Sequence, residues 1–266
     1  MPAPTIPRTA IPKFSKTELN TADLCAQALW YGINFETANP FHVSDAHLMN
    51  KFAPNFYHYH KQKKKFQPDI FVLDVNELIN ACGIKMLFRG IADMDLRKGI
   101  NSLYADVYPK FKKALKTPNE VSTHEVAVQC LESLNKGLVV DPKANRLNLS
   151  SRILFFLSPN LQTFNMNNHI AKFFGLQSRP HHHYAEYFQL FSKGMVTNQT
   201  NLSKYKMPPA RDGLDSVTWN NAARTDWWKR RVLDLAVLQY ARTKIAAHPN
   251  LRSSIKRKIA EDSLNP

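Results

Sequence analysis

The chain lacks the short motifs by which many enzymes can be recognised from sequence. Only 8 of its 266 residues are glycine, and no glycine-rich phosphate-binding loop occurs. The HExxH motif of zinc proteases and the GxSxG motif of serine hydrolases are absent as well. The sequence therefore gives no sign of P-loop, HExxH-type or GxSxG-type chemistry, and any activity must rest on residues distant in the chain.

Cysteines and long apolar runs are also scarce. The three cysteines (Cys25, Cys82 and Cys130) are odd in number, form no CxxC pair and lie in apolar helical patterns, which is typical of buried thiols in a reducing compartment. The longest apolar runs, such as 153–157, are too short to span a bilayer. Residues 1–7 are proline-rich without the apolar centre of a signal peptide. We therefore expect a cytoplasmic protein with no membrane partner.

Acidic residues are few relative to basic ones. Lys and Arg number 36 against 21 Asp and Glu, so the net charge is +15, while 44% apolar residues suffice for a packed core. Such an excess favours polyanionic partners, and its interleaving with aromatic residues favours nucleic acid over a solubilising role. In the stretch 56–66, Lys63, Lys64 and Lys65 follow several aromatic residues. This stretch is either a phosphate-contacting loop or a solvated charge run.

The hydrophobic pattern predicts an all-α protein. Strand-like alternation is confined to 70–73 and 138–140, and no repeat of fixed period is present. We expect an extended N-terminal arm over residues 1–18 and a helical region over 19–266. The helices are expected to begin after Asn20 or Thr21, to begin again after Ser44, and to cover 184–191, about 220–246 and about 252–258, with a polar loop over 194–216.

Two neighbouring segments carry a resemblance to a known family. Residues 149–159 predict a short helix, and after a loop residues 167–176 predict a second short helix that ends in Phe174-Gly175-Leu176. Asn167-Asn168-His169-Ile170 is similar to the element that opens the second helix in the helix-hairpin-helix DNA glycosylase superfamily. Thr225-Asp226-Trp227-Trp228 and the residues that follow resemble a C-terminal helix of its bacterial 8-oxoguanine-glycosylase-fold branch. The likeness covers about 147–245, and it implies a two-lobed helical bundle with a basic cleft.

The chain departs from that family's pattern where its chemistry is carried. Arg152 stands where the family has its catalytic Lys, and Asn167 stands where it has its Asp. Residues 148–151 replace the family's usual glycine-rich hairpin. A guanidinium stays protonated and is a poor nucleophile, so Arg152 would not form a Schiff base with the sugar. The resemblance therefore implies a monofunctional glycosylase that uses water, and Asp226 is the candidate for the carboxylate that stabilises the oxocarbenium-like state. The alternative for Asp226 is a helix cap or first-turn acid.

The remaining candidate residues are assigned to DNA contact. Trp227 and Trp228 point about 100° apart on a helix, so one is expected in the core and the other could stack on an extruded base; burial of both is the alternative. The three adjacent histidines 181–183 point in different directions, which favours a surface or phosphate-facing role over metal binding. The residues expected to contact phosphates are Ser150, Ser151, His169, Lys172, Lys63, Lys64, Lys65 and Arg230.

These assignments lead to one main hypothesis and two alternatives. The main hypothesis is a monomeric DNA glycosylase, without metal or cofactor, that extrudes and excises a modified base from duplex DNA. The resemblance implies that this base could belong to foreign phage DNA, in which case the enzyme would serve defence. The alternatives are a non-catalytic DNA-binding protein that kept the fold, and a basic helical module that binds RNA or an acidic protein.

Overall fold

The described part of the chain is helical. In the computed structural model, residues 10–40, 44–49, 125, 128–129, 151–152, 154–156, 162–176, 182–208, 221–242 and 247–264 are described. Within these ranges the chain forms no β-strand, and its one β-like pairing is an isolated bridge between Ile33 and Pro40. The expectation of a mainly helical protein is therefore confirmed for these residues. The two lobes and the basic cleft stay a prediction.

The first helix begins earlier than expected. Helix α1 spans Lys16–Trp30, so the expected arm over 1–18 gives way to helix at Lys16 rather than after Asn20 or Thr21. The reason is a capping box: the Ser15 hydroxyl accepts a hydrogen bond from the Glu18 amide, and the Glu18 carboxylate accepts one from the Ser15 amide. These reciprocal bonds satisfy amides that otherwise lack partners at a helix N-terminus.

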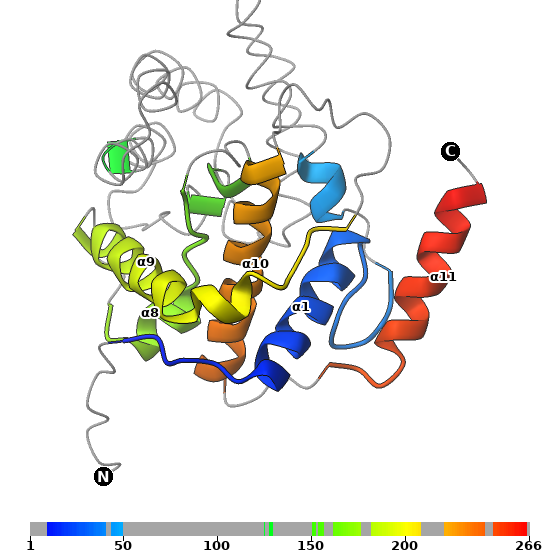
Figure 1. The fold of residues 1–266 in the computed structure, drawn as a ribbon, viewed down its shortest axis with the longest axis horizontal. Helices are drawn as coiled ribbons and strands as arrows, with labels where there is room; N and C mark the ends of the chain where they lie inside the picture. The colour runs from blue at the N-terminus through cyan, green and yellow to red at the C-terminus, as the bar shows by residue number, and fades with distance from the viewer. Residues whose placement is uncertain are drawn as a thin grey trace, which may run out of the picture.

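Helix α10 lies at the centre of the described structure. It spans Asn221–Ala241, within the expected range of about 220–246, and packs against α1, α8 (Asn168–Phe173) and α9 (His182–Leu202). Figure 1 shows α10 in orange between α1 on one side and α8 and α9 on the other. Because neighbours cover several of its sides, apolar residues recur all around α10 rather than along one stripe. Those buried are Trp227, Trp228, Val232, Leu233, Leu235, Ala236, Val237 and Leu238.

Helix α9 is longer than its sequence pattern indicated. A polar loop was expected from residue 194, but the helix continues to Leu202. Burial of Asn198 explains the difference, because its amide bonds Pro12 and Phe14 in the preceding extended segment. Gly194 allows that segment to approach closely, since a Cβ there would lie 2.8 Å from Cδ1 of Ile11. Tertiary contacts thus override the weak helix propensity of the Val-Thr-Asn-Gln-Thr-Asn run.

Two further helical segments are present where they were expected, and the second extends beyond the expected range of about 252–258. The segment 45–49 begins directly after Ser44, whose hydroxyl accepts a hydrogen bond from the His47 amide. The basic C-terminal segment forms α11, Leu251–Leu264, at the edge of the described structure beside α1. Cys25 is a buried free thiol in α1, and burial raises its pKa to about 12. None of the described helices has the length and apolarity needed to cross a membrane.

Candidate nucleic-acid interface

The two short helical segments around residues 150–176 are present. Residues 151–152 and 154–156 are helical, 162–167 form a connection without regular secondary structure, and α8 follows. Asn167 is the N-cap of α8, and its side chain accepts a hydrogen bond from the His169 amide at 2.8 Å. Gly175 ends the helix with a φ of 71°, a left-handed conformation that glycine adopts without strain. The predicted helix–loop–helix order is confirmed for the described residues.

Side chains from other elements hold the connection 162–167 in place. The Ser151 hydroxyl accepts a hydrogen bond from the Met166 amide at 2.8 Å. The Tyr187 hydroxyl donates to the Asn165 carbonyl at 3.0 Å and accepts from the Asn167 amide, and Tyr184 bonds the backbone of Phe164 in the same way. Buried backbone groups outside a helix or sheet need such partners. The start of α8 is therefore fixed by three side-chain hydroxyls.

Helix α8 presents one exposed polar face. Ile170 and Ala171 are buried in the core, whereas His169 and Lys172 are exposed. The two exposed residues are three positions apart, so they lie on the same side of the helix. The structure thus places both predicted DNA-contacting residues of α8 on one outward face.

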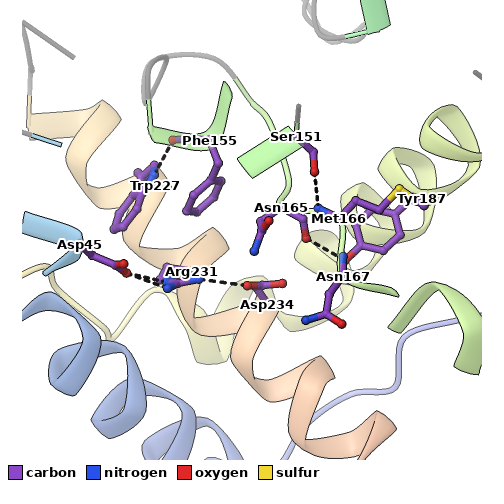
Figure 2. A network of polar contacts seen from close by, with 10 residues as sticks. All are labelled: Asp45, Ser151, Phe155, Asn165, Met166, Asn167, Tyr187, Trp227, Arg231 and Asp234. Atoms are coloured by element: carbon purple, nitrogen blue, oxygen red, sulfur yellow. Dashed lines mark hydrogen bonds and ion pairs between the residues drawn. The ribbon is translucent and has the colours of Figure 1, made fainter. Parts of the chain in front are cut away.

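A buried ionic cluster lies beside this element. The Arg231 guanidinium contacts Asp45 at 2.8 Å and Asp234 at 3.2 Å, and all three side chains are at most 10% exposed. Figure 2 shows Arg231 between the two carboxylates, with the Asn165 side chain directed towards Asp234. The Asn165 amide also bonds Asp234. The cluster therefore joins α10 to the segment 45–49 and to the connection that precedes α8.

Burial governs the titration of Asp234. Desolvation raises its pKa to about 6, although the charges of Arg231 and Arg152 and hydrogen bonds from Asn165 and Arg231 favour the ionised form. Arg152 is thus electrostatically coupled to Asp234, but its buried Nε atom has no hydrogen-bond partner. Because Asp234 is only 5% exposed, the carboxylate in this cluster is closed to a substrate.

Arg230 does not serve as the expected surface phosphate clamp. Its side chain is buried, its Nη1 donates to the Thr163 carbonyl at 2.7 Å, and its guanidinium lies 5.8 Å from the Phe155 ring centroid. Burial lowers its pKa to about 10, so it stays charged at neutral pH. Because the Arg230 guanidinium is buried and bonded to the Thr163 backbone, it links α10 to the connection 162–167. This is a correction of the sequence-based role.

The base-stacking role of the adjacent tryptophans is also corrected. Trp227 and Trp228 are both 0% exposed, so the alternative of burying both holds. The Trp227 indole N–H donates to the Phe155 carbonyl (Figure 2). The Trp228 indole N–H donates to the carboxylate of Asp23 in α1. Trp30 contacts both rings. Because α10 is covered on opposite sides, two side chains 100° apart both find core partners.

Ser151 is likewise part of the interior. Ser151 is 0% exposed, and its hydroxyl accepts a hydrogen bond from the Met166 amide. It therefore holds the connection 162–167 in place and does not contact phosphate. Ser150 and the three lysines Lys63, Lys64 and Lys65 lie outside the described residues. The side chains of the histidines 181–183 also lie outside them, and the described residues contain no group of three side chains suited to a metal ion.

The three candidate catalytic residues do not assemble. Asp226 is exposed and pairs with Lys229 at 3.5 Å, Asn167 caps α8, and Arg152 is coupled to Asp234. No hydrogen bond or ion pair joins these three side chains within the described structure. Asp226 and Asp234 are separated by eight residues of helix, a rise of about 12 Å.

Sequence reasoning missed the residues that organise this region. The i, i+3 spacing of Arg231 and Asp234 within an apolar helix was the signal available for a buried ion pair. Nothing in the sequence linked Asp45, Asn165 or Tyr187 to that pair, because they come from separate elements. Comparison with models of known families, with curated proteins and with solved structures finds no significant match for the chain.

Proposed function

We propose that the protein binds duplex DNA and that the outward face of α8 is one of its contacts. The observation that carries this proposal is the fixed presentation of His169 and Lys172 on a helix whose start is held by Ser151 and Tyr187. A cation on a preorganised element loses little entropy when it meets a phosphate. The net charge of +15 supplies the long-range attraction to a polyanion. This supports the DNA-binding hypothesis over the solubilising role of the charge.

The proposal is tested by removing the polar face of α8. We expect His169→Ala with Lys172→Gln to weaken binding to a 24-base-pair duplex by about five- to tenfold at 0.1 M salt, because the Lys172 cation and the His169 hydrogen-bond donor are lost. The slope of log affinity against log salt should fall by about 0.9 for the one Lys. Fluorescence anisotropy over a salt series measures both quantities.

A matched control removes the same charge from another helix. Lys193 is exposed on α9, so Lys193→Gln lowers the net charge by one without altering α8. We expect it to change affinity less than about twofold, as a surface substitution remote from the contact. Equal losses in the two variants would show that net charge alone drives binding. An absence of wild-type binding at 50 mM salt would reject the proposal.

Base excision is a second proposal, and the accessibility of Asp226 favours it. Its side chain is 68% exposed near the start of α10, so the carboxylate is open to a substrate, unlike that of Asp234. In a hydrolytic mechanism this carboxylate would stabilise positive charge on the sugar and orient water. The resemblance to helix-hairpin-helix glycosylases supplies the reaction class. The burial of Trp227 and Trp228 leaves the base-binding residues of this proposal unassigned.

Asp226→Asn is expected to abolish base release while leaving DNA affinity within about twofold, because the charge is needed only in the transition state. Free-base release from duplexes with modified bases measures the first quantity, and anisotropy measures the second. Borohydride should trap no covalent protein–DNA adduct with the wild type, since Arg152 offers no nucleophilic amine. A trapped adduct would contradict the monofunctional mechanism, and inactivity on every modified duplex would leave DNA binding as the function.

A further inference from the structure

Helix α11 is attached to the rest of the described structure through one narrow apolar contact. Leu251 and Ile255 are buried against Ala28 of α1 and Ile33 of the segment that follows it. Figure 1 shows α11 in red at the edge of the molecule, on the far side of α1 from α10. The side of α11 that faces away from this contact is exposed to solvent.

The cations of α11 fall into two groups. Arg257 and Lys258 pair with the acidic residues one turn further on, Glu261 and Asp262, at 3.8 and 3.0 Å. Arg252 and Lys256 are both exposed, and neither forms an ion pair within the described structure. They are four positions apart, so their side chains lie next to each other on the same face. One face of α11 therefore carries two adjacent positive charges that no acidic residue in the described part of the chain neutralises.

We propose that Arg252 and Lys256 of α11 form a second nucleic-acid contact and bind backbone phosphates. This inference rests on the proposed DNA binding and extends it to a surface that the resemblance does not assign. The exposed neighbours Ser253, Ala260 and Ser263 are short, so a phosphate backbone can approach the two cations closely. The only large apolar side chain exposed on α11 among the described residues is Ile259, at 39%. One apolar residue is too little for a protein- or membrane-binding face.

This surface is separate from the α8 face. Helix α8 packs on α10, α10 on α1, and α1 on α11, so the two contacts lie at opposite ends of a row of four helices. With helix spacings of 8–10 Å, the axes of α8 and α11 are up to about 24–30 Å apart. A duplex of 24 base pairs is about 80 Å long, which exceeds this separation.

The test compares two double variants that remove equal charge from the same helix. Arg252→Gln with Lys256→Gln removes the unpaired cations, whereas Arg257→Gln with Lys258→Gln removes the paired ones. We expect the first variant to lower affinity for the duplex by tenfold or more at 0.1 M salt and to reduce the salt slope by about 1.8. The second should change affinity less than about threefold, because its cations already have partners. Both should unfold at the wild-type temperature, since surface substitutions cost little stability.

The outcomes separate this inference from the proposed function. If the α8 variant loses affinity and the Arg252/Lys256 variant does not, α11 is not a contact and the inference is wrong while DNA binding stands. Equal losses in the two α11 variants would also overturn it, because net charge alone would explain them. If the wild type does not bind the duplex, both the proposed DNA binding and the α11 contact are wrong. Ile259→Ser should leave DNA affinity unchanged. If the wild type bound phosphatidylserine vesicles more tightly than DNA, and Ile259→Ser lost that binding, this face of α11 would be a membrane contact instead.

Discussion

Replacing Trp227 with alanine is expected to lower the free energy of unfolding by about 3–5 kcal/mol. The indole is 0% exposed, and its ring contacts Trp30, Trp228, Phe155 and Phe156 with centroid distances of 4.8–6.3 Å. Truncation leaves a cavity where α10 meets α1 and the helical segment 154–156, and the Phe155 carbonyl loses its hydrogen-bond donor. Urea denaturation followed by circular dichroism measures the change.

Val196 offers a control for this effect. It is 72% exposed on α9, so Val196→Ala should change the free energy of unfolding by no more than about 0.5 kcal/mol. A loss below about 1.5 kcal/mol in Trp227→Ala would mean that the ring is not part of the core. In that case Trp227 would again be a candidate for stacking on an extruded base.

The helical class could be predicted because its signals are local. Apolar spacing identified α1, the sequence also indicated the long α10 and the basic α11, and the glycine after Phe174 correctly marked the end of α8. Boundaries failed where the deciding residue was overlooked or distant. The Ser15–Glu18 capping box was readable but missed, whereas the continuation of α9 to Leu202 depends on Asn198 meeting a segment about 185 residues earlier in the chain.

The site could be predicted less well than the fold, because burial decides the role of a charged side chain and is not encoded locally. Arg230 and Arg231 look like phosphate-binding residues in the Lys-Arg-Arg run, yet both are 3% exposed. Lys172, with the same kind of charge, is on the outside of a short helix. The difference follows from which helices surround α10, and that depends on contacts between segments far apart in sequence.

Replacing Arg231 with leucine is expected to destabilise the protein by about 3–5 kcal/mol at pH 7.5, because it leaves two buried carboxylates without their shared cation. Arg231 Nη2 contacts Asp45 and Nη1 contacts Asp234, so both acidic residues lose their ion pair in one step. Thermal and urea unfolding at several pH values measure the effect. Lys229→Leu is a control on the same helix, since its side chain is partly exposed and, among the described residues, pairs only with the exposed Asp226.

The pH dependence distinguishes loss of this cation from simple loss of packing. The pKa of Asp234 in the folded protein is about 6, above its ordinary value near 4, so the folded state binds more protons than the unfolded state between these values. The contribution of Asp234 to stability therefore falls as pH rises from about 4 to about 6. Removing Arg231 raises this pKa further, because its positive charge favours the carboxylate. The deficit of Arg231→Leu should consequently shrink towards pH 4.5, and adding Asp234→Asn should recover part of it at pH 7.5. A deficit that is the same at both pH values, and is not relieved by Asp234→Asn, would show that Arg231 acts through packing alone.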